Sequence, residues 1–408
     1  MKIVQINAVY EYSSTGRTSK EMHLFLKKNG HESFVFCNNI NDPQNNVFKL
    51  GSTIEYKLHR LLGCITGMQG FLSFFRTKLL VHKLKDINPD VIVLRNLHSN
   101  STQLCTILKY LIKYNIPTVI VLHDCWMFTG GCVYYTKDGC YKWKKQCEKC
   151  PLIKGIKGSW FFDTSTWTYN IKKKYLTQLK RLAIIGVSDW VANESRQSFL
   201  KNSFVIKRIY NWIDLDVFKP RDTNELRKKL GITDNDFVIL GVAQNWSEAK
   251  GLSYYYKVAE KYPEIKIVMV GAFDKDHPSN MITVGPLSDT NQLAEYYSMA
   301  DVFLNFTQQE TFGKVTAEAL AAGTPIIVNN NTASPELVGD CGIIIPNNDL
   351  ASCYKAIEEI RTKGKKVYTM QCRERAVSLF DKFNGLQEYM DLFNLLTKSK
   401  YEKDFVYF

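Results

Sequence analysis

Short runs of apolar, β-branched residues alternate with helix-like segments along this chain, and the whole pattern occurs twice. The strand candidates of the first half are "KIVQINAV", "SFVFCN", "DVIVLRNL", "TVIVLH" and "LAIIGVS". Those of the second half are "FVILGVAQN", "IKIVMVG", "VFLNF", "PIIVNN" and "GIIIP". Strands that are apolar on both faces belong to parallel sheets with helices on both sides. We therefore predict an α/β protein with two doubly wound domains.

The length of 408 residues also favours two domains, since single cores rarely grow beyond about 250–300 residues. We place the N-terminal domain at 1–203 and the C-terminal domain at 204–384. The last stretch, 385–408, is expected to form a helix that packs back on the N-terminal domain. Residues 125–170 interrupt the alternation with aromatic, Gly and Cys residues. A long irregular insertion of this kind is usually functional or specially braced.

Composition excludes two classes of protein. A hydrophobic content of 45% with 23% charged residues is typical of globular proteins and excludes a mostly disordered chain. The N-terminal "MKIVQINAVY" has neither the apolar run nor the cleavage site of a signal peptide, and no long uncharged apolar run predicts a membrane-spanning helix. We therefore expect a cytoplasmic protein with reduced thiols, in which clustered cysteines favour metal binding over disulfides.

The most informative motif is "FTQQETFGKVTAEALAAGTPIIV", residues 306–328. It predicts a strand, a polar loop with Glu310, and a helix that begins near Gly313. The open N-terminus of such a helix suits a phosphate, and Lys314 adds a cation. Glu310 and Glu318 can accept hydrogen bonds from sugar hydroxyls. The motif therefore fits a nucleotide-sugar, although its spacing alone is equally compatible with an ordinary amphipathic helix that has an acidic cap.

The spacing Glu310-x7-Glu318 resembles the E-x7-E signature of the large retaining glycosyltransferase family 4, whose members have the GT-B fold. Other segments resemble that family in the same order along nearly the whole chain. They are "STGRTSKEMHLFLKKNGHES", "VIVLRNLHSN", "VLHDCWMFTGGC", "IYNWIDLDVFKP", "GVAQNWSEAKGL" and "LAEYYSMADVFLN". The resemblance implies two Rossmann-like domains that face each other across a cleft. The segments "VIVLRNLHSN" and "VLHDCWMFTGGC" resemble strand ends of the acceptor domain in bacterial members that build surface polysaccharides.

The resemblance also implies roles for individual residues. Glu310 would contact the donor sugar and help to stabilise the transition state, and Glu318 would hold the ribose hydroxyls. Lys250 would neutralise the diphosphate. The N–H groups of Gly313, Lys314 and Val315 would complete the phosphate site. Gly16 and Arg17 would approach the diphosphate from the N-terminal domain.

His123 follows the fourth predicted strand and, by the resemblance, would stand near the transferred sugar as a second catalytic residue. A lone histidine at a strand end can also be a purely structural, capped residue. The adjacent Asp124 would either orient the imidazole or cap the following turn. Sheets of this class bind ligands at the carboxyl ends of their strands, which agrees with the functional reading.

One position departs from the family pattern. Family members commonly carry an Arg six residues before the clamp lysine, where this chain has Gln244. A neutral amide does not replace a bidentate guanidinium as a phosphate ligand. More of the diphosphate charge would then rest on Lys250, the helix N-terminus and Lys314 or Arg17.

The implied reaction is the transfer of a sugar from a nucleotide-diphosphate sugar to a lipid-linked glycan acceptor, with retention at the anomeric carbon. The departing phosphate would help to deprotonate the acceptor hydroxyl, and no catalytic metal is expected. Backbone groups near 285–287 would contact the base. Two other readings remain open: a zinc-dependent nucleic-acid-binding protein, and a nucleotide-sugar epimerase of the same fold. We expect no nucleic-acid partner, because the first of these leaves the twin domains unexplained.

Four cysteines, Cys132, Cys140, Cys147 and Cys150, fall within nineteen residues and end in a C-x-x-C pair. They could supply four thiolates to one structural Zn²⁺, although the two longer gaps are unusual. Free thiols and disulfides are the alternatives. A closed four-cysteine site would have no catalytic role and would brace the insertion.

The insertion is also strongly basic. Residues 137–181 hold eleven lysines and one arginine against three acidic residues, a net charge of +9. The aromatic residues Trp160, Phe161, Phe162 and Trp167 stand among these lysines. Such a surface suits an anionic membrane, and we expect peripheral contact with the inner face of the cell membrane. The alternative is a solvated basic face that serves solubility.

Overall fold

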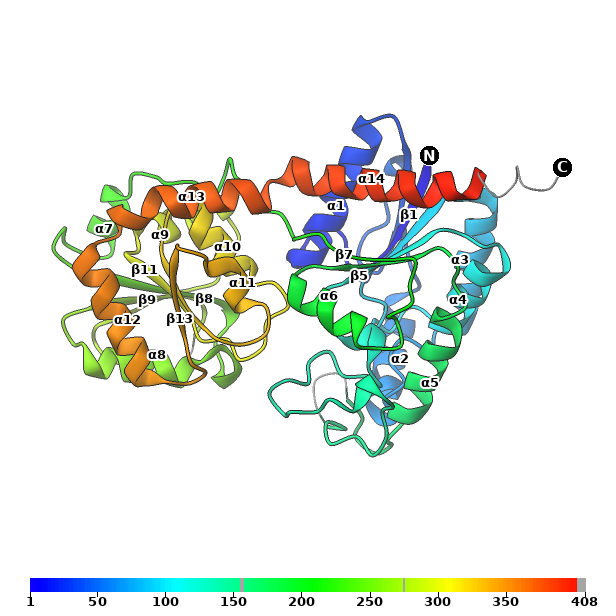
Figure 1. The fold of residues 1–408 in the computed structure, drawn as a ribbon, viewed down its shortest axis with the longest axis horizontal. Coiled ribbons are helices and arrows are strands. Elements are labelled where there is room, and N and C mark those ends of the chain that lie inside the picture. The colour runs from blue at the N-terminus through cyan, green and yellow to red at the C-terminus, as the bar shows by residue number, and fades with distance from the viewer. Residues whose placement is uncertain (155–157, 274–275, 402–408) are drawn as a thin grey trace. The chain divides into compact units, whose positions relative to one another are not determined.

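The computed structural model describes residues 1–154, 158–273 and 276–401, with side chains up to Lys398. The chain divides into two compact units, each built on its own parallel sheet (Figure 1). The first unit comprises Met1–Ile209 and the chain from Leu386 onward, and the second comprises Tyr210–Gly385. This confirms the predicted α/β class with two doubly wound, Rossmann-like domains.

The sheet of the first unit has seven parallel strands in the order β3-β2-β1-β4-β5-β6-β7. The order reverses beside β1, so that β1 and β4 are neighbours, with Ile3 opposite Val91. Their apolar residues are buried on both faces, as the uniform strand patterns predict. The strands are β1 (Lys2–Ile6), β2 (Glu32–Cys37), β3 (Val47–Lys49), β4 (Val91–Leu94), β5 (Thr118–Leu122), β6 (Leu182–Gly186) and β7 (Val205–Arg208).

Helices connect these strands, and the last helix of the chain returns to the first unit. Its Thr397 hydroxyl contacts Met1 Sδ at 3.8 Å, and its Glu388 forms an ion pair with Lys207 at 2.6 Å. The helices are α1 (Ser13–Lys28), α2 (Thr53–Thr66), α3 (Phe74–Ile87), α4 (Leu104–Lys113), α5 (Ser165–Leu176), α6 (Asp189–Arg196) and α14 (Lys382–Tyr401).

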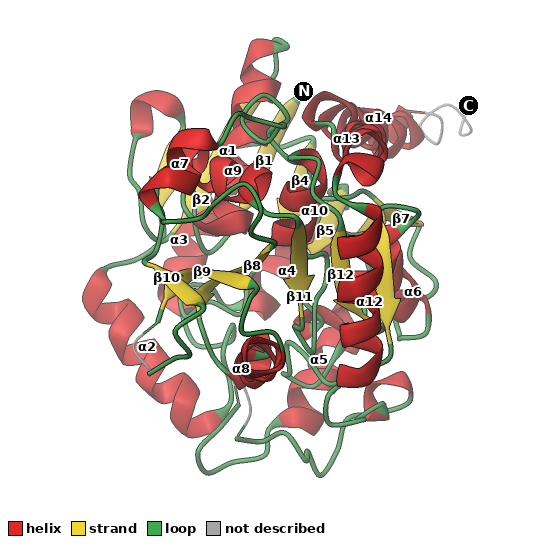
Figure 2. Cartoon of the chain, turned by 90° about the vertical axis from the view of Figure 1, so that its left-hand side faces the viewer, coloured by secondary structure: helices red, strands yellow, loops and turns green. Residues whose placement is uncertain are grey.

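The sheet of the second unit has six parallel strands in the order β10-β9-β8-β11-β12-β13. Helices α9 and α10 lie over one side of it, and α8 and α12 lie over the other (Figures 1 and 2). The strands are β8 (Val238–Asn245), β9 (Lys266–Ala272), β10 (Met281–Val284), β11 (Val302–Asn305), β12 (Ile326–Asn329) and β13 (Gly342–Ile345). The helices are α7 (Asn224–Lys229), α8 (Leu252–Lys261), α9 (Thr290–Met299), α10 (Lys314–Ala321), α11 (Ser334–Val338), α12 (Leu350–Lys363) and α13 (Lys366–Phe380).

The insertion after β5 contains two short 3₁₀ helices, Trp126–Phe128 and Lys142–Lys144, before α5 begins at Ser165. Large aromatic side chains bury themselves inside it, and Tyr169 of α5 donates its hydroxyl to the carbonyl oxygens of Trp143 and Lys145 at 2.9 and 3.0 Å. The segment is therefore a packed part of the first unit. Among the described helices, none has the length and apolar character that a membrane span requires.

Candidate active site

The loop between β11 and α10 carries Glu310 at the carboxyl end of the second sheet. Its backbone is anchored on both sides, because the Glu310 N–H donates to Thr332 Oγ1 at 2.9 Å and its carbonyl accepts from the Ala333 N–H at 3.2 Å. The Glu310 side chain stays partly exposed. The carboxylate therefore stands on a fixed backbone with access to solvent.

Helix α10 begins directly after Gly313, which adopts a φ of +89°. That left-handed conformation favours glycine. No side chain caps this helix in the described structure, so the N–H groups of its first turn, at Lys314 and Val315, point to an open end. An uncapped helix N-terminus carries a partial positive charge that suits an anion.

Lys250 lies on a second loop, the 3₁₀ helix Glu248–Lys250 that precedes α8. The Gln308 N–H donates to the Ala249 carbonyl at 3.3 Å, which ties this loop to the Glu310 loop. Gly251 follows with a φ of +77°, and a Cβ there would lie 2.2 Å from Phe306 Cβ. Lys250, Glu310 and the start of α10 are thus brought to one edge of the second unit. Gln244, where the family commonly has Arg, is exposed at the end of β8.

Glu318 lies deeper than its predicted role suggests. Its side chain is buried on α10, and its Oε2 accepts a hydrogen bond from the Tyr297 hydroxyl at 3.1 Å. Burial and the neighbouring Glu318 carboxylate raise the pKa of Tyr297 well above its usual value, so that the hydroxyl remains a donor. Contact of Glu318 with a ribose stays a prediction. Residues 285–287, predicted to contact the base, follow β10, and a Cβ at Gly285 would meet no atom within 4 Å.

In the first unit, His123 follows β5 and receives a hydrogen bond from Arg95, which follows the neighbouring strand β4. Arg95 Nη1 lies 3.2 Å from His123 Nε2 and 3.3 Å from Thr18 Oγ1 of α1. A guanidinium can only donate, so Nε2 accepts and the proton of a neutral imidazole is on Nδ1. Burial and the nearby Arg95 charge lower the pKa of His123 to about 3. His123 is therefore uncharged at neutral pH.

Asp124 pairs with a histidine that sequence reasoning missed. Its Oδ2 lies 2.7 Å from His98 Nε2, and its Oδ1 accepts from the Trp126 N–H at 2.8 Å. Burial alone would raise the pKa of Asp124, but His98 and the Trp126 N–H hold it below its usual value. The Trp126 contact caps the following turn, which is one of the two roles predicted for Asp124. His98 could have been suspected, since it also follows a strand of the parallel sheet.

Gly16 and Arg17 lie at the end of the first turn of α1, the helix that Arg95 contacts through Thr18. Gly16 is buried, and a Cβ there would lie 3.2 Å from the Glu11 nitrogen, which itself donates to the Gly16 carbonyl at 3.1 Å. Arg17 is exposed. The structure thus gathers His123, Arg95 and the first turns of α1 in the first unit. Glu310, Lys250 and the start of α10 are gathered separately in the second.

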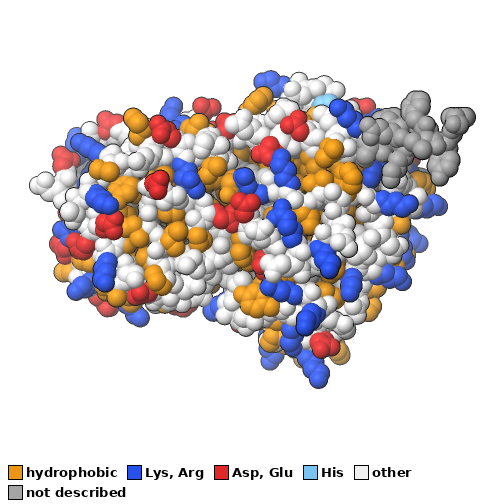
Figure 3. Space-filling model, in the orientation of Figure 1, with side chains coloured by type: hydrophobic (Ala, Val, Ile, Leu, Met, Phe, Trp, Pro, Cys, Tyr) orange, Lys and Arg blue, Asp and Glu red, His pale blue; other side chains and the backbone are white. Residues whose placement is uncertain are grey.

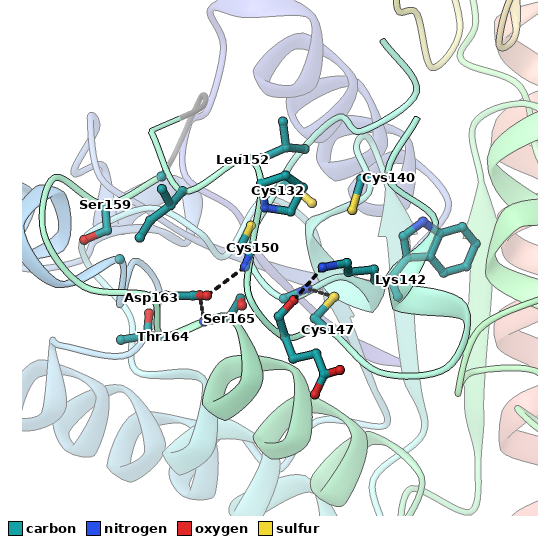
Figure 4. Close-up of a pocket in the computed structure, with 18 of the residues that line it drawn as sticks. Cys132, Cys140, Lys142, Cys147, Cys150, Leu152, Ser159, Asp163, Thr164 and Ser165 are labelled. Carbon is teal, nitrogen blue, oxygen red and sulfur yellow. Dashed lines mark hydrogen bonds between the residues drawn. The ribbon is translucent and has the colours of Figure 1, made fainter. Parts of the chain in front are cut away.

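The four clustered cysteines line one cavity in the insertion, together with Lys142 (Figure 4). All eleven cysteines are free thiols in the structure. Within the part of the chain that is described, no three Cys, His, Asp or Glu side chains stand in the arrangement of a bound metal ion. The predicted zinc is therefore not shown, and the cysteines are brought together around a shared space.

Comparison with known proteins gives the family. Residues 15–217, about half of the chain, match the model "Glycosyltransferase Family 4", and residues 222–376 match "Glycosyl transferases group 1". Spore coat protein SA of Bacillus subtilis is 29% identical over 196 residues, 40% of this chain and 50% of that protein. Alpha-monoglucosyldiacylglycerol synthase of Acholeplasma laidlawii is 23% identical over 350 residues, 78% of this chain and 82% of that protein. The chain thus spans only about half the length of the first of these relatives.

Solved structures agree on the fold. Sucrose-phosphate synthase from Thermosynechococcus elongatus superposes with a TM-score of 0.71 at 16% identity and covers 98% of this chain and 99% of that one. Anabaena HepE in complex with UDP-glucose gives a TM-score of 0.62 at 16% identity over 96% and 98% of the two chains. With both units, the strand order of each sheet and the two family models in agreement, this chain belongs to glycosyltransferase family 4 and has the GT-B fold.

Proposed function

We propose that this protein transfers a sugar from a nucleotide-diphosphate sugar to a hydroxyl acceptor and retains the configuration of the anomeric carbon. The observation that carries the proposal is the hydrogen bond between the Gln308 N–H and the Ala249 carbonyl. It joins the loop of Lys250 to the loop of Glu310, beside the open start of α10. A cation, backbone donors and a carboxylate therefore share one edge of the second unit.

The chemistry follows from charge. When the bond between the sugar and the diphosphate breaks, negative charge grows on the phosphate oxygens and positive charge grows on the sugar ring. Lys250 and the N–H groups of Lys314 and Val315 would stabilise the first, and Glu310 would stabilise the second. The departing phosphate would take the proton of the acceptor hydroxyl. No divalent metal is needed in this scheme, because side chains and the helix terminus supply the positive charge.

His123 is proposed to contact the donor sugar as a neutral hydrogen-bonding group. A pKa of about 3 makes it a poor proton carrier at neutral pH. The Arg95 contact fixes its ring and its tautomer. Its contribution would therefore be orientation of the sugar rather than transfer of a proton.

Relatives suggest the classes of donor and acceptor. The HepE structure holds UDP-glucose, which supports a nucleotide-sugar donor. The Acholeplasma relative is named for a product built on diacylglycerol, and a relative from Klebsiella pneumoniae, 26% identical over 84% of its length, is named for the cps region. We therefore propose a lipid-linked acceptor in bacterial polysaccharide or glycolipid synthesis.

A surface of the first unit fits a membrane-borne acceptor. Helix α2 exposes Ile54, Leu58, Leu61 and Leu62, and only Gly63 of this helix is buried. The Trp160 N–H donates to the Cys64 carbonyl at 2.7 Å, so the exposed residues Trp160, Phe161 and Phe162 join the end of α2. The exposed residues of α2 thus extend the apolar surface predicted from Trp160, Phe161 and Phe162.

Exposed cations flank these apolar side chains. Lys57 and Arg60 lie on α2, Lys78 lies on α3 and Lys154 lies in the insertion. Figure 3 shows Lys and Arg side chains (blue) over the lower part of this unit, where Figure 1 draws the insertion. Apolar groups that enter a headgroup layer, with lysines around them, favour an anionic lipid surface. We propose that this surface holds the protein on the inner face of the membrane.

A donor screen tests the transfer itself. The full chain would be incubated with UDP-, GDP- and ADP-sugars and a lipid-linked acceptor, and released nucleoside diphosphate would be measured with and without the acceptor. Acceptor-dependent release that Glu310→Gln lowers by about 10²–10³-fold and Glu374→Gln leaves intact supports the proposal. A changed sugar without any acceptor would instead support the epimerase. A rise in melting temperature with an oligonucleotide, but with none of the nucleotides, would support the nucleic-acid-binding protein.

A further inference from the structure

The cysteine cavity of the insertion has features that neither the fold nor the transfer reaction requires. Cys132, Cys140, Cys147 and Cys150 come from three separate stretches, yet all line the same cavity, and their sulfur atoms surround it in Figure 4. The cavity measures about 50 Å³, which is far too small for a sugar nucleotide. Four soft donors around a space of this size match the donor set that Zn²⁺ prefers in structural sites.

The turn between the last two cysteines is held in a strained shape. Lys149 adopts a φ of 43°, a conformation that costs a side-chain-bearing residue about 1 kcal/mol or more. Lys142 Nζ donates to the carbonyl oxygens of Glu148 and Lys149 at 3.2 and 3.0 Å, and the Cys150 N–H donates to Asp163 Oδ2 at 2.7 Å. These contacts keep the turn tight, and a tight C-x-x-C turn lets both sulfur atoms reach one ion.

A backbone donor is aimed at one of the sulfur atoms. The Gly130 N–H lies 3.1 Å from Cys147 Sγ. A Cβ at Gly130 would stand 2.8 Å from Cys147 Cβ, so glycine is required for this approach. A buried N–H bond to sulfur is stronger when the sulfur is a thiolate than when it is a thiol. Such donors are typical partners of metal-bound thiolates.

A fully buried lysine lies beside the cavity. The side chain of Lys172 on α5 has no exposed surface, and its Nζ donates to the Trp126 carbonyl at 2.5 Å and lies 4.1 Å from the Trp126 ring centroid. No carboxylate forms an ion pair with it among the described residues, and its acidic neighbours are Cys132, Cys147 and Asp124. Thiolates bound to a metal at Cys132 and Cys147 would add negative charge beside this side chain.

We propose that Cys132, Cys140, Cys147 and Cys150 bind one structural Zn²⁺ as four thiolates. Binding would release four thiol protons and leave a site of net charge −2, with Lys172 beside it. The four side chains would have to turn inward to bring their sulfur atoms to about 2.3 Å from the ion. This inference concerns the insertion alone and does not depend on the sugar-transfer reaction.

The zinc would have a positioning role. Trp126 links the cysteine cavity to the Asp124–His98 pair, because its carbonyl accepts a hydrogen bond from Lys172 and its N–H donates one to Asp124. Asp124 in turn holds His98. A braced insertion would therefore keep the loop after β5 in the shape that places the Asp124–His98 pair.

Metal analysis of the full chain, purified without chelator, tests this directly. We expect about one zinc per chain, and at least a tenfold lower content in Cys147→Ser and in Cys150→Ser. Cys105→Ser is the control, because Cys105 is buried on α4 outside the cavity, and it should retain the metal. A wild-type chain without zinc would overturn the proposal. Thiol titration in denaturant would then show whether the cysteines are free thiols or paired in disulfides.

A second measurement uses the wild-type chain, so that it does not depend on whether the cysteine variants fold. The wild-type chain would be stripped of metal and reconstituted with Co²⁺, and a thiolate-to-cobalt charge-transfer absorption is expected. Lys172→Met should lose cobalt or zinc to a chelator faster than Lys173→Met, a neighbouring exposed lysine. The absence of the charge-transfer band at one equivalent of Co²⁺ would contradict a four-thiolate site.

Discussion

Glu310 is proposed to stabilise positive charge on the sugar ring, and Lys250 to stabilise negative charge on the diphosphate. Single substitutions should separate these two effects. Glu310→Gln removes the carboxylate that would stabilise the sugar ring while the side chain keeps its size. We expect kcat to fall by about 10²–10³-fold, the usual cost of one lost transition-state contact, with little change in the affinity for nucleoside diphosphate. Glu374→Gln on α13 should leave kcat unchanged. Near-normal turnover of Glu310→Gln would contradict its assignment.

Lys250→Ala should act on binding instead. With Gln244 in place of the usual arginine, Lys250 carries more of the diphosphate charge, and its removal should weaken nucleoside diphosphate binding by about 10–100-fold. Calorimetric titration of the full chain measures this affinity. Lys229→Ala, an exposed lysine of α7 in the same unit, is the matched control. Equal affinities in the two variants would show that Lys250 does not hold the diphosphate.

His123 should leave a signature in the pH dependence of stability. Its pKa of about 3 in the folded chain lies below the ordinary value of 6.5, so the unfolded chain binds the extra proton between these values. The His123 contribution to the free energy of unfolding is therefore complete above about pH 6.5 and is lost as the pH falls toward 3.

The test compares urea unfolding at pH 7 and pH 5. We expect the fall in stability between these two values to be smaller in His123→Asn than in the wild type, by about 2 kcal/mol. His82→Asn, an exposed histidine of α3, should behave like the wild type. An equal fall in wild type and His123→Asn would contradict the depressed pKa.

Residues that follow strands or begin helices could be predicted from the sequence, but their hydrogen-bond partners could not. Glu310, Lys250 and His123 stand at element ends that local patterns mark. Arg95 and His98 support His123 and Asp124 only because β4 and β5 are neighbours in the sheet. The His98–Asp124 and Arg95–His123 contacts join residues 26 and 28 positions apart in the sequence. They depend on the order of strands in the sheet and cannot be recognised from the local sequence around His123. For the same reason the Tyr297 contact of Glu318 could not be foreseen.

At the level of elements, Gly251 before α8 and Gly313 before α10 shape the loops that carry Lys250 and Glu310. Gly251→Ala would force a Cβ to 2.2 Å from Phe306 and would strain a φ of +77°. We expect a loss of about 1–3 kcal/mol of stability and weaker nucleotide binding, because the strain falls on the loop that carries Lys250. Gly285→Ala should be nearly neutral in stability, since no atom lies within 4 Å of its Cβ. Thermal melts of both variants compare them, and a smaller effect at Gly251 than at Gly285 would contradict this account.

The strands that pattern reading missed share one property. β3, β7 and β10 all lie at the edges of their sheets and are three or four residues long. An edge strand has a neighbour on one side only, so it can be short and partly polar. The central strands are buried on both faces, and their uniform apolar runs made them recognisable. Sequence pattern therefore predicted the interior of each sheet and missed most of the edges.

At the level of the whole molecule, the apolar surface of α2 and residues 160–162 should govern association with membranes. We expect the full chain to pellet with anionic vesicles more than with neutral ones and to be released by high salt, because screening weakens lysine contacts with lipid. Phe161→Ser, which changes a side chain that is 70% exposed, should reduce pelleting severalfold. Met370→Ser, which changes an equally exposed apolar residue of the second unit, should not. Equal pelleting with anionic and neutral vesicles would contradict the proposed surface.

The central proposal for this protein is that sugar transfer retains the configuration of the anomeric carbon. It is tested most directly by ¹H NMR of the product, in which the coupling of the anomeric proton reports the configuration. With the donor and lipid-linked acceptor identified by the screen, we predict that the new glycosidic bond has the same anomeric configuration as the donor. We also predict that Glu310→Gln forms no product on the same timescale. A product of inverted configuration, or equal product from both proteins, would contradict the account.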